Sequence, residues 1–423
     1  MKLKSLLEGR AERAAEKFIG GLVAQSPFKG HVYLVGGAVR DELRGLEPKD
    51  LDFVITQKDG GIKFAEWICK HCGVYKHGSN PVIYPRFGTA KFQLYGVKHD
   101  GVDIGHLEFE SVMTRTEKYQ TGSRKPSVEF GDIEQDAKRR DLTFNAIYKQ
   151  VDTGRIVDPL KVGIRDLKAN IVRTTSDPDV IFVDDPLRML RAVRFTVRDK
   201  STLPVHMFRA IKKNAHSLKT ISSERIYDEL SKILKTHDAD KGVRILALTG
   251  LLHEFLPEVH TPDLNGLKAS NADIISRMAA LLRPAGRAAA QKVMTRLKCT
   301  NDEIKKVSVL LGMSIVIKDT MDDAAIRKLR LEYGDDLFSH IVDFAVKVLG
   351  HGGRVAHHWR TVPMVAKMPI NGDDVIRMLQ LDKKTDGQKV GKILAVVRDA
   401  WLKDPTMRSG EALKIAQSAS YKL

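Results

Sequence analysis

The fold of this chain is decided by two short stretches, VYLVGGAVRDELRG at residues 32–45 and KDLDFVI at residues 49–55. The first predicts a buried strand over 31–35, a turn at Gly36-Gly37 and a helix over 38–44. The second predicts a strand over 50–56, in which successive side chains point to opposite faces. Asp50 and Asp52 therefore share one face, while the apolar residues between them fill the core. Strand, turn, helix and strand in this order predict a mixed α/β domain.

Asp50 and Asp52 are candidate metal ligands and catalytic residues. Their Cα atoms are expected about 7 Å apart, two residues along a strand. Hard divalent cations take oxygen ligands, together with waters and substrate phosphates. Two Mg²⁺ ions held in this way can stabilise both the attacking and the leaving oxygen of an in-line displacement. An isolated Asp-x-Asp is more often the solvated face of an edge strand, so this interpretation depends on the neighbouring sequence.

The glycine turn before the carboxylates favours the metal interpretation. Gly36 and Gly37 let the backbone approach a phosphate, and the N–H groups at the following helix start can bind it. A Gly-Gly turn alone is a weak signal. Followed by Arg40 and, about ten residues later, by the carboxylate pair, it predicts a nucleotide triphosphate site at Gly36, Gly37 and Arg40.

A second candidate site lies in DDPLRMLRAVRF, residues 184–195. Asp185 can cap a helix that begins near Pro186, and Arg188 follows one turn later on the same face. A carboxylate acceptor and a guanidinium donor presented together can satisfy the Watson–Crick edge of cytosine or adenine. Arg191 and Arg194 extend the basic face toward phosphates. The alternative for any single pair is a salt-bridged helix end.

Five ordered motifs together resemble the class II CCA-adding enzymes (tRNA nucleotidyltransferases) and their bacterial poly(A) polymerase relatives. The resemblance covers residues 30–235 and, weakly, the sequence PINGDD at 369–374. It departs from the family pattern at Lys161-Val162-Gly163, where a tighter turn is usual. The motifs are LVGGAVRDELRG with KDLDFVI, RRDLTFNAI (139–147), DPLKVGIRDL (158–167), DDPLRMLRAVRF (184–195) and ERIYDELSKIL (224–234).

The resemblance implies an α+β fold, with a mixed-sheet, polymerase β-like nucleotidyltransferase head followed by all-α neck, body and tail domains. The expected boundaries are 1–165 for the catalytic head, 166–235 for the neck with the nucleotide-selecting helix, 236–330 for the body and 331–423 for a tRNA-binding tail. Apolar residues at helical spacing from about residue 180 onward agree with this division.

The implied function is template-independent addition of C, C and A to the 3′ end of tRNA from CTP and ATP, with release of pyrophosphate. Enzymes that add only CC or only A, and bacterial poly(A) polymerases, remain alternatives. The sequence FGTAK at residues 87–91 resembles the CCA-adding members. An inactive RNA-binding module is the alternative from another class, and a broken Asp-x-Asp would be its signature.

The resemblance also implies roles for residues outside the two candidate sites. Arg139 and Arg140 suit the triphosphate, because guanidinium groups bind phosphate through two hydrogen bonds. Asp141 and Asn145 are assigned to the ribose and to local hydrogen bonding. Further candidates for phosphate, RNA or site contacts are Arg115, Glu224 and Arg225.

A third acidic residue is often supplied by a neighbouring strand in such sites. Glu108 in the segment HLEF is the first choice, because this segment resembles the family at that strand, and Asp103 is the fallback. An ordinary surface carboxylate is the alternative for either position. Strands are expected at 82–84, 87–95 and 103–110, with a hairpin turn near Lys98–Gly101.

Composition favours a nucleic acid partner. The chain has 70 Lys and Arg against 53 Asp and Glu, a formal net charge of +17 and a pI of about 9.6, which attracts polyanions. Aromatic residues make up only 6%, which favours recognition of a folded RNA through phosphates and shape over a stacking platform for single strands. A tRNA fits both observations.

The remaining features favour a cytoplasmic protein without a membrane segment. No apolar run reaches the roughly 18 residues of a membrane span, no secretory signal is recognisable, and three cysteines do not suggest disulfides. Cys69 and Cys72 lack the second pair that a structural zinc site needs. His237-Asp238 lacks the further ligands of a phosphohydrolase site. The oligomeric state is not predicted.

Overall fold

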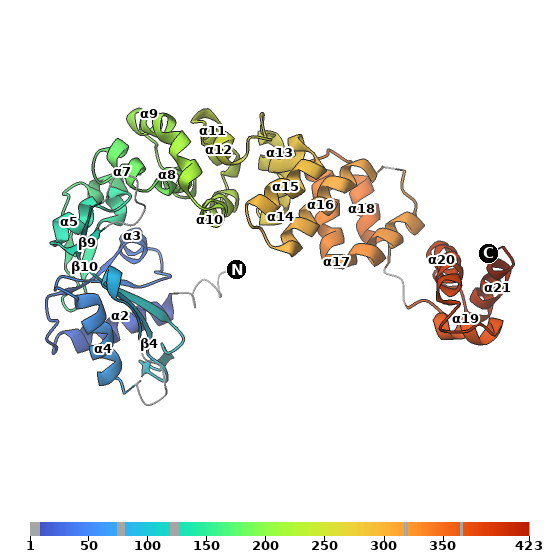
Figure 1. Cartoon of the computed structure of the whole chain (residues 1–423), viewed down its shortest axis with the longest axis horizontal. Coiled ribbons are helices and arrows are strands. Elements are labelled where there is room, and N and C mark those ends of the chain that lie inside the picture. Colours follow the sequence, from blue (N-terminus) through green and yellow to red (C-terminus); the bar gives the residue numbers. More distant parts are fainter. Residues whose placement is uncertain are drawn as a thin grey trace. The chain divides into compact units, whose positions relative to one another are not determined.

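The computed structural model describes residues 9–73, 81–118, 127–316, 318, 320–363 and 367–422. The chain divides into two compact units, one made of residues 1–233 with 245–255 and the other of residues 234–244 with 256–423. Figure 1 shows a head that contains the strands, followed along the chain by helices only. The α+β class with an all-α remainder is therefore confirmed.

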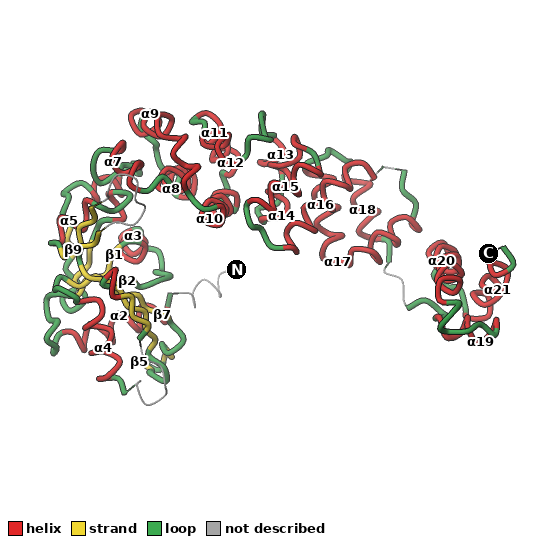
Figure 2. Tube along the Cα trace, in the orientation of Figure 1, coloured by secondary structure: helices red, strands yellow, loops and turns green. Residues whose placement is uncertain are grey.

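The described part of the head contains a seven-stranded sheet in the order β11-β10-β1-β2-β7-β4-β3, shown in yellow in Figure 2. Strand β2 runs parallel to β7, whereas the other neighbours are antiparallel. The strands are β1 (Val32–Val35), β2 (Asp52–Ile55), β3 (Val82–Tyr84), β4 (Thr89–Gln93), β7 (Glu108–Met113), β10 (Tyr148–Gln150) and β11 (Ile156–Val157). Two small hairpins pair β5 (Lys98–His99) with β6 (Val102–Asp103), and β8 (Arg115–Lys118) with β9 (Ser127–Phe130).

One face of the sheet packs against α4 (Gly60–His71), and α2 (Arg10–Val23) contributes to the buried core. The sequence pattern also predicts a helix over 6–24, and residues 6–8 of this range lie outside the described residues. The aromatic rings of Phe53, Phe92 and Phe109 pack together with Phe64 of α4 in this core. Gly61 allows a close approach, because a Cβ built there would lie 2.4 Å from the carbonyl oxygen of Gly88.

The opposite face carries both a small core and the candidate active site. Tyr33, Val35 and Val54 pack with Tyr148 and with residues of α5 (Ile133–Lys138). Asp52 lies on this face, because it pairs across the strands with Val35. The 3₁₀ turns of the head are η2 (Pro85–Phe87) and η3 (Thr143–Asn145).

The predicted hairpin is longer and more complex than its sequence pattern indicated. The strand expected over 103–110 is replaced by the short β6 and the later β7. The reason is a turn after β6, in which the Asp103 side chain accepts a hydrogen bond from the N–H of Gly105 (2.8 Å). Strand β7 therefore begins at Glu108, and β4 pairs with β7 rather than with a strand through Asp103.

The strand expected over 50–56 is shorter as well, because β2 begins at Asp52 and ends at Ile55. Asp50 lies before the strand. Strand β1 and helix α3 (Gly37–Leu43) follow the expected ranges to within one residue at each end.

Beyond β11 the described residues form helices, apart from isolated bridges. Those that follow the sheet up to residue 261 are α6 (Gly163–Lys168), α7 (Pro178–Asp184), α8 (Leu187–Arg198), α9 (Val205–Asn214), η4 (Ala215–Thr220), α10 (Ser223–Leu234), α11 (Ala239–Leu248) and α12 (Leu251–Phe255). The later ones are α13 (Leu264–Ala269), α14 (Ile274–Leu282), η5 (Arg283–Ala285), α15 (Arg287–Arg296), α16 (Asn301–Val316), α17 (Asp323–Lys347) and α18 (Gly353–Thr361). Within the described residues, no helix is both long and apolar enough to cross a bilayer.

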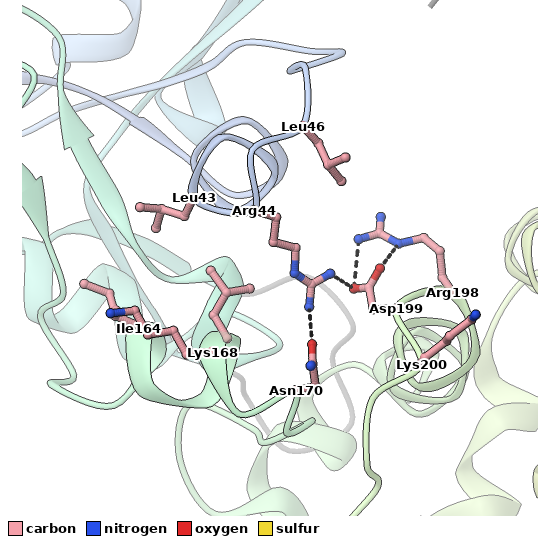
Figure 3. Close-up of a pocket in the computed structure, with 10 residues that line it drawn as sticks. Leu43, Arg44, Leu46, Ile164, Lys168, Asn170, Arg198, Asp199 and Lys200 are labelled. Atoms are coloured by element: carbon pink, nitrogen blue, oxygen red, sulfur yellow. Dashed lines mark hydrogen bonds and ion pairs between the residues drawn. The ribbon is translucent and has the colours of Figure 1, made fainter. Parts of the chain in front are cut away.

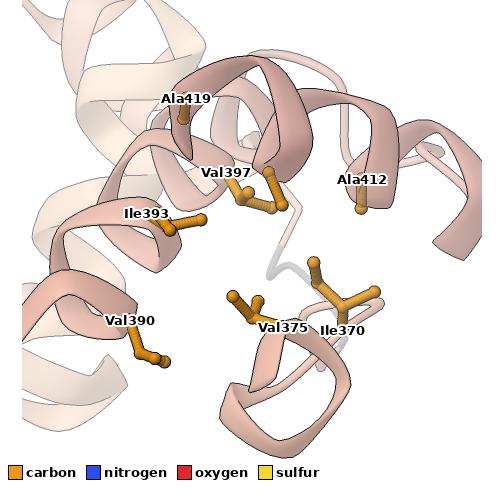
Figure 4. Close-up of a cluster of buried hydrophobic side chains, with 8 residues drawn as sticks. Ile370, Val375, Val390, Ile393, Val397, Ala412 and Ala419 are labelled. Carbon is orange, nitrogen blue, oxygen red and sulfur yellow. The ribbon is translucent and has the colours of Figure 1, made fainter. Parts of the chain in front are cut away.

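The last three helices, α19 (Gly372–Leu379), α20 (Gly387–Lys403) and α21 (Ser409–Ser420), enclose their own apolar cluster, shown in Figure 4. The sequence PINGDD begins this module. Ile370 is buried in the cluster, and the Asn371 side chain caps α19 in a capping box with Asp374. The local geometry thus assigns this motif a structural role.

Candidate active site

The candidate active site centres on Asp52 at the start of β2. Its register partner on β7 is Glu110. Asp52 stays accessible to solvent, but the surrounding protein and then the charges of Glu110 and Asp50 raise its pKa to about 6, against a partial opposing effect of Arg140 and Lys91. Neighbouring carboxylates that disfavour their own ionisation are a fitting environment for a divalent cation.

The structure brings Asp50 near this centre, since its charge acts on Asp52, and it leaves Asp50 exposed before the strand. Glu108 points along the same face of β7 as Glu110, but its carboxylate binds the ammonium of Lys91 at 2.7 Å. Glu110 was missed by the sequence interpretation. Because side chains alternate along β7, residues 108 and 110 lie on one face. Only the register with β2 shows that residue 110, rather than 108, lies opposite Asp52.

The donor set suits a hard metal ion that also binds substrate phosphates. Among the described residues, no group of three or more His, Cys, Asp or Glu side chains forms a metal cluster. Mg²⁺ is commonly held by one or two carboxylates, with waters and phosphates in its remaining positions. Asp50, Asp52 and Glu110 have oxygen atoms of this kind, and burial followed by the charge of Glu110 raises the pKa of Asp52.

A small pocket of about 250 Å³ adjoins Glu110. Arg115 belongs to its wall, and its Nη1 donates to the carbonyl oxygen of Phe87 at 3.0 Å. The lining residues are Tyr84, Phe87, Thr89, Lys91, Glu110, Val112 and Arg115.

The glycine turn lies at the end of β1, next to β2 in the sheet. Gly36 has φ 74°, in the left-handed region, and open space lies where its Cβ would be. Glycine is therefore needed here for its conformation. Arg40 is only 5% exposed; its guanidinium donates to Asp41 and to Oδ1 of Asn145 (2.8 Å), so in this state it binds protein acceptors.

Arg139 and Arg140 both bind Asp136, a fully buried carboxylate that the sequence interpretation missed. Arg139 donates to one carboxylate oxygen (2.7 and 2.9 Å), and Arg140 to the other (2.9 and 3.1 Å). The hydroxyl of Tyr148 also donates to Asp136, at 2.6 Å. Burial alone would raise the pKa of Asp136, but the two guanidinium charges and these hydrogen bonds hold it well below its usual range.

Asp141 connects the head to α8. It accepts hydrogen bonds from Nε of Arg191 (2.8 Å) and from Nδ2 of Asn145 (3.1 Å). Burial opposes its ionisation, yet Arg191 and the hydrogen bonds lower its pKa to about 2. A continuous chain of contacts therefore runs from Arg40 through Asn145 and Asp141 to Arg191.

Asp185 and Arg188 lie at the start of α8, but they do not pair with each other. One oxygen of Asp185 accepts from the N–H of Leu187, and the other from Nη2 of Arg225 at 2.9 Å. Arg225, predicted only as a further candidate, thus contacts Asp185. Arg188 makes no side-chain hydrogen bond or ion pair with the described residues, although its charge helps to lower the pKa of Asp141. Glu224 is exposed.

The remaining basic residues of α8 surround one buried ring. Among the described residues, Phe195 has four guanidinium carbons between 4.6 and 5.7 Å from its ring centroid, those of Arg40, Arg191, Arg194 and Arg198. Glu229 of α10 lies near Arg191 (3.5 Å) and Arg194 (3.2 Å). The cations of this face are thus held by acids and by an aromatic ring.

A larger pocket of about 550 Å³ lies at the far ends of α3 and α8, shown in Figure 3. None of the predicted site residues lines it. Asp199 binds Nη1 of Arg44 at 2.7 Å and receives two hydrogen bonds from Arg198 (2.6 and 2.9 Å). The pocket therefore contains an ionic contact between the C-terminal ends of the two helices.

Comparison with known proteins agrees with this architecture. Residues 32–173 match the family model for the poly A polymerase head domain, and residues 203–261 match the model for the probable RNA and SrmB-binding site of polymerase A. The motifs predicted a resemblance to this family, and both matched segments agree with that prediction.

The relatives come from both branches of the family. The chain is 34% identical to the tRNA nucleotidyltransferase cca2 of Schizosaccharomyces pombe over 226 residues, which is 52% of this chain and 46% of the relative. It is 31% identical to poly(A) polymerase I of Haemophilus influenzae over 229 residues, 53% of this chain and 48% of the relative. These matches span about half the length of each relative.

A solved structure shares the whole fold. The CCA-adding enzyme of Bacillus stearothermophilus in complex with CTP has a TM-score of 0.72 and 23% identity, and the match covers 98% of both chains. At this identity the likeness establishes the fold alone.

Proposed function

We propose that the protein adds C, C and A to the 3′ end of tRNA, using CTP and ATP and no nucleic acid template. The observation that carries the proposal is the pairing of Asp52 with Glu110 on adjacent strands, beside the glycine turn at Gly36. Neighbouring carboxylates next to a phosphate-binding turn form a site for metal-dependent transfer of a nucleotidyl group.

The metal would be held by Asp50 and Asp52, with Glu110 beside them. Bound Mg²⁺ would supply Lewis-acid activation of the RNA 3′-hydroxyl and neutralise the charge of the departing pyrophosphate. The chain itself provides orientation. The turn at Gly36-Gly37 offers backbone N–H groups to the triphosphate, and no covalent enzyme intermediate is required.

Base selection would fall to Asp185 and Arg188. Arg188 is uncommitted to any acceptor among the described residues, so its donor fork can turn to a nucleotide base. Asp185 offers acceptor oxygens held in place by Leu187 and Arg225. Acceptor and donor together complement the edges of cytosine and adenine, whereas they match uracil and guanine less well.

The buried network supports this role by fixing α8 on the head. Arg191 binds Asp141, which is in turn bound to Asn145. Because Asp141 and Asn145 are buried, they position the selecting helix, and the ribose contact that the resemblance implies remains a proposal for Asp141.

A tRNA substrate is supported by the net charge of +17 and by the match of residues 203–261 to an RNA-binding model. Enzymes that add only CC or only A share this head, as do poly(A) polymerases. The mass of a tRNA lacking its 3′ end, after incubation with CTP alone, ATP alone or both, distinguishes them. Three added nucleotides ending in A are expected only with both triphosphates.

Long adenosine tracts with ATP alone would instead identify a poly(A) polymerase. Unchanged tRNA mass under all three conditions, together with retained tRNA binding, would identify an inactive RNA-binding module. Both residue sets that such a module would lose, the carboxylates at 50 and 52 and the arginine at 188, are present.

A further inference from the structure

We propose that the 250 Å³ pocket beside Glu110 binds the 3′-terminal nucleotide of the acceptor RNA, whose base stacks on Tyr84 and Phe87. This inference rests on the proposed nucleotidyl transfer and names where its acceptor binds. The volume lies just below the usual range for ligand pockets, which suits one nucleotide unit rather than an extended segment.

The pocket continues the face that carries the carboxylates. Asp52 pairs with Glu110, and Glu110 pairs with Lys91 across β7 and β4. Tyr84 on the edge strand β3 pairs with Thr89, which lies two residues from Lys91 on the same face. A row of side chains therefore leads from Asp52 toward Tyr84 without crossing to the other side of the sheet.

Two aromatic rings on this wall are exposed. Tyr84 is 43% exposed and Phe87 is 39% exposed, and both residues line the pocket. Single exposed apolar residues are ordinary, but two rings beside a candidate catalytic carboxylate form a stacking surface. Stacking on aromatic rings tolerates any base, as needed for an acceptor end that changes after every addition.

The order of the strands assigns the two substrates to opposite sides. The glycine turn follows β1 on one side of β2, whereas β7, β4 and β3 lie on the other. An in-line displacement needs the attacking oxygen and the leaving pyrophosphate on opposite sides of the phosphorus atom. With the triphosphate at the glycine turn, the acceptor end lies over β7, β4 and β3, where the pocket is.

The loop that presents Phe87 is held in a defined conformation. Arg115 donates to its carbonyl oxygen. The next residue, Gly88, has φ 60°, and a Cβ there would lie 2.8 Å from the Met113 side chain. Glycine is therefore required for the turn. The low aromatic content of the whole chain does not oppose this site, because two rings in one place suffice.

The test uses the full chain and a tRNA that carries 2-aminopurine as its 3′-terminal base, whose fluorescence falls on stacking. We expect the wild-type protein to quench this fluorescence and the double variant Tyr84→Ala/Phe87→Ala to leave it unquenched. In steady-state assays, kcat/KM for the tRNA should fall about tenfold per ring, while KM for CTP stays within about twofold. Tyr84→Phe and Phe87→Tyr keep the rings and should restore both signals.

Tyr95→Ala is the matched control, because Tyr95 is 45% exposed in the segment just after β4 but does not line the pocket. Unchanged quenching in the double variant, a raised KM for CTP in place of the acceptor effect, or an equal loss in Tyr95→Ala would overturn the proposal. Quenching does not require turnover. A quenched but inactive wild type would therefore reject the proposed function and leave the acceptor pocket standing.

Discussion

Asp52 and Glu110 lie directly across from each other on the parallel strands β2 and β7. Burial among the surrounding protein, and then repulsion from the charge of Glu110, raise the pKa of Asp52 to about 6. The fold thus holds a carboxylate arrangement that is unfavourable without a cation. Such an arrangement is expected where binding, rather than stability, has been selected.

We predict that Asp52→Asn abolishes nucleotide addition, with a loss of about 1,000-fold or more in kcat. The amide keeps the shape but removes the charge that a metal ion needs. Affinity for tRNA should change less than about twofold. Single-turnover incorporation from labelled CTP and a tRNA filter-binding assay measure both quantities. Glu108→Gln, whose carboxylate binds Lys91, is the matched control and should stay near wild type.

The same substitution should stabilise the fold by about 1 kcal/mol near pH 7, a value reduced for the solvent exposure of Asp52. Because the folded-state pKa is raised from 3.8 to about 6, ionisation of Asp52 weakens the fold as pH rises through this window. The advantage of Asp52→Asn over wild type should therefore grow from pH 4 to pH 6 and then level off. Urea unfolding curves of both proteins across this pH range measure the difference in the free energy of unfolding. A difference that does not change with pH would contradict the prediction.

Asp136→Ala should lower the free energy of unfolding by about 3–5 kcal/mol, because it leaves two guanidinium groups without their buried carboxylate. Asp136→Asn keeps the volume of the side chain but removes its charge, so it should cause most of the same loss in the free energy of unfolding. Glu134→Gln removes an exposed pair with Lys138 and should change stability by less than about 0.5 kcal/mol. Urea denaturation of the three variants separates the buried network from the surface pair.

Arg188→Ala should weaken discrimination among the four triphosphates, bringing incorporation of UTP and GTP within about tenfold of CTP and ATP. In the proposed mechanism its donor fork recognises the base edge, and Arg188 makes no side-chain hydrogen bond or ion pair with the described residues. Arg209→Ala removes an exposed arginine of the neighbouring α9 and serves as the control. Full selectivity in Arg188→Ala would rule out a protein template.

Gly61→Ala should destabilise the head by about 1–3 kcal/mol, because the added Cβ would meet the backbone of Gly88, Ser111 and Val112 at 2.4–2.7 Å. None of these backbone atoms can rotate away. Since Ser111 and Val112 follow Glu110 on β7, activity should fall as well. Gly21→Ala in α2, where nothing lies within 4 Å, should instead stabilise by up to about 1 kcal/mol. Thermal unfolding compares the two.

The early part of the fold could be predicted because its signals are local. The strand, glycine turn and helix over 32–43 follow from neighbouring residues, and the all-helical remainder follows from apolar spacing. The bounds of β7 could not be predicted in this way, because a side chain, Asp103, ends β6 by forming a turn with Gly105.

The sequence indicated which types of residue form the candidate site, but it did not indicate which of them contact each other. Glu108 and Glu110 both fit the alternation of a strand, and only the pairing of β7 with the distant β2 brings Glu110 to Asp52. Asp136 reads as a surface residue of a charged helix, yet Arg139, Arg140 and Tyr148 enclose it. The side-chain partner of Asp185 is Arg225, forty residues away, and no local pattern around Asp185 indicates this contact.

The contacts of Asp199 restrict which segments can be exchanged between related proteins by recombination. This single carboxylate binds Arg44, which caps the C-terminal end of α3, and Arg198, the last residue of α8. A recombinant whose crossover lies between residues 44 and 198 would combine Arg44 from one parent with Arg198 and Asp199 from the other. Viable hybrids should therefore inherit these three positions as a set, and natural variation at one of them should be accompanied by change at the others.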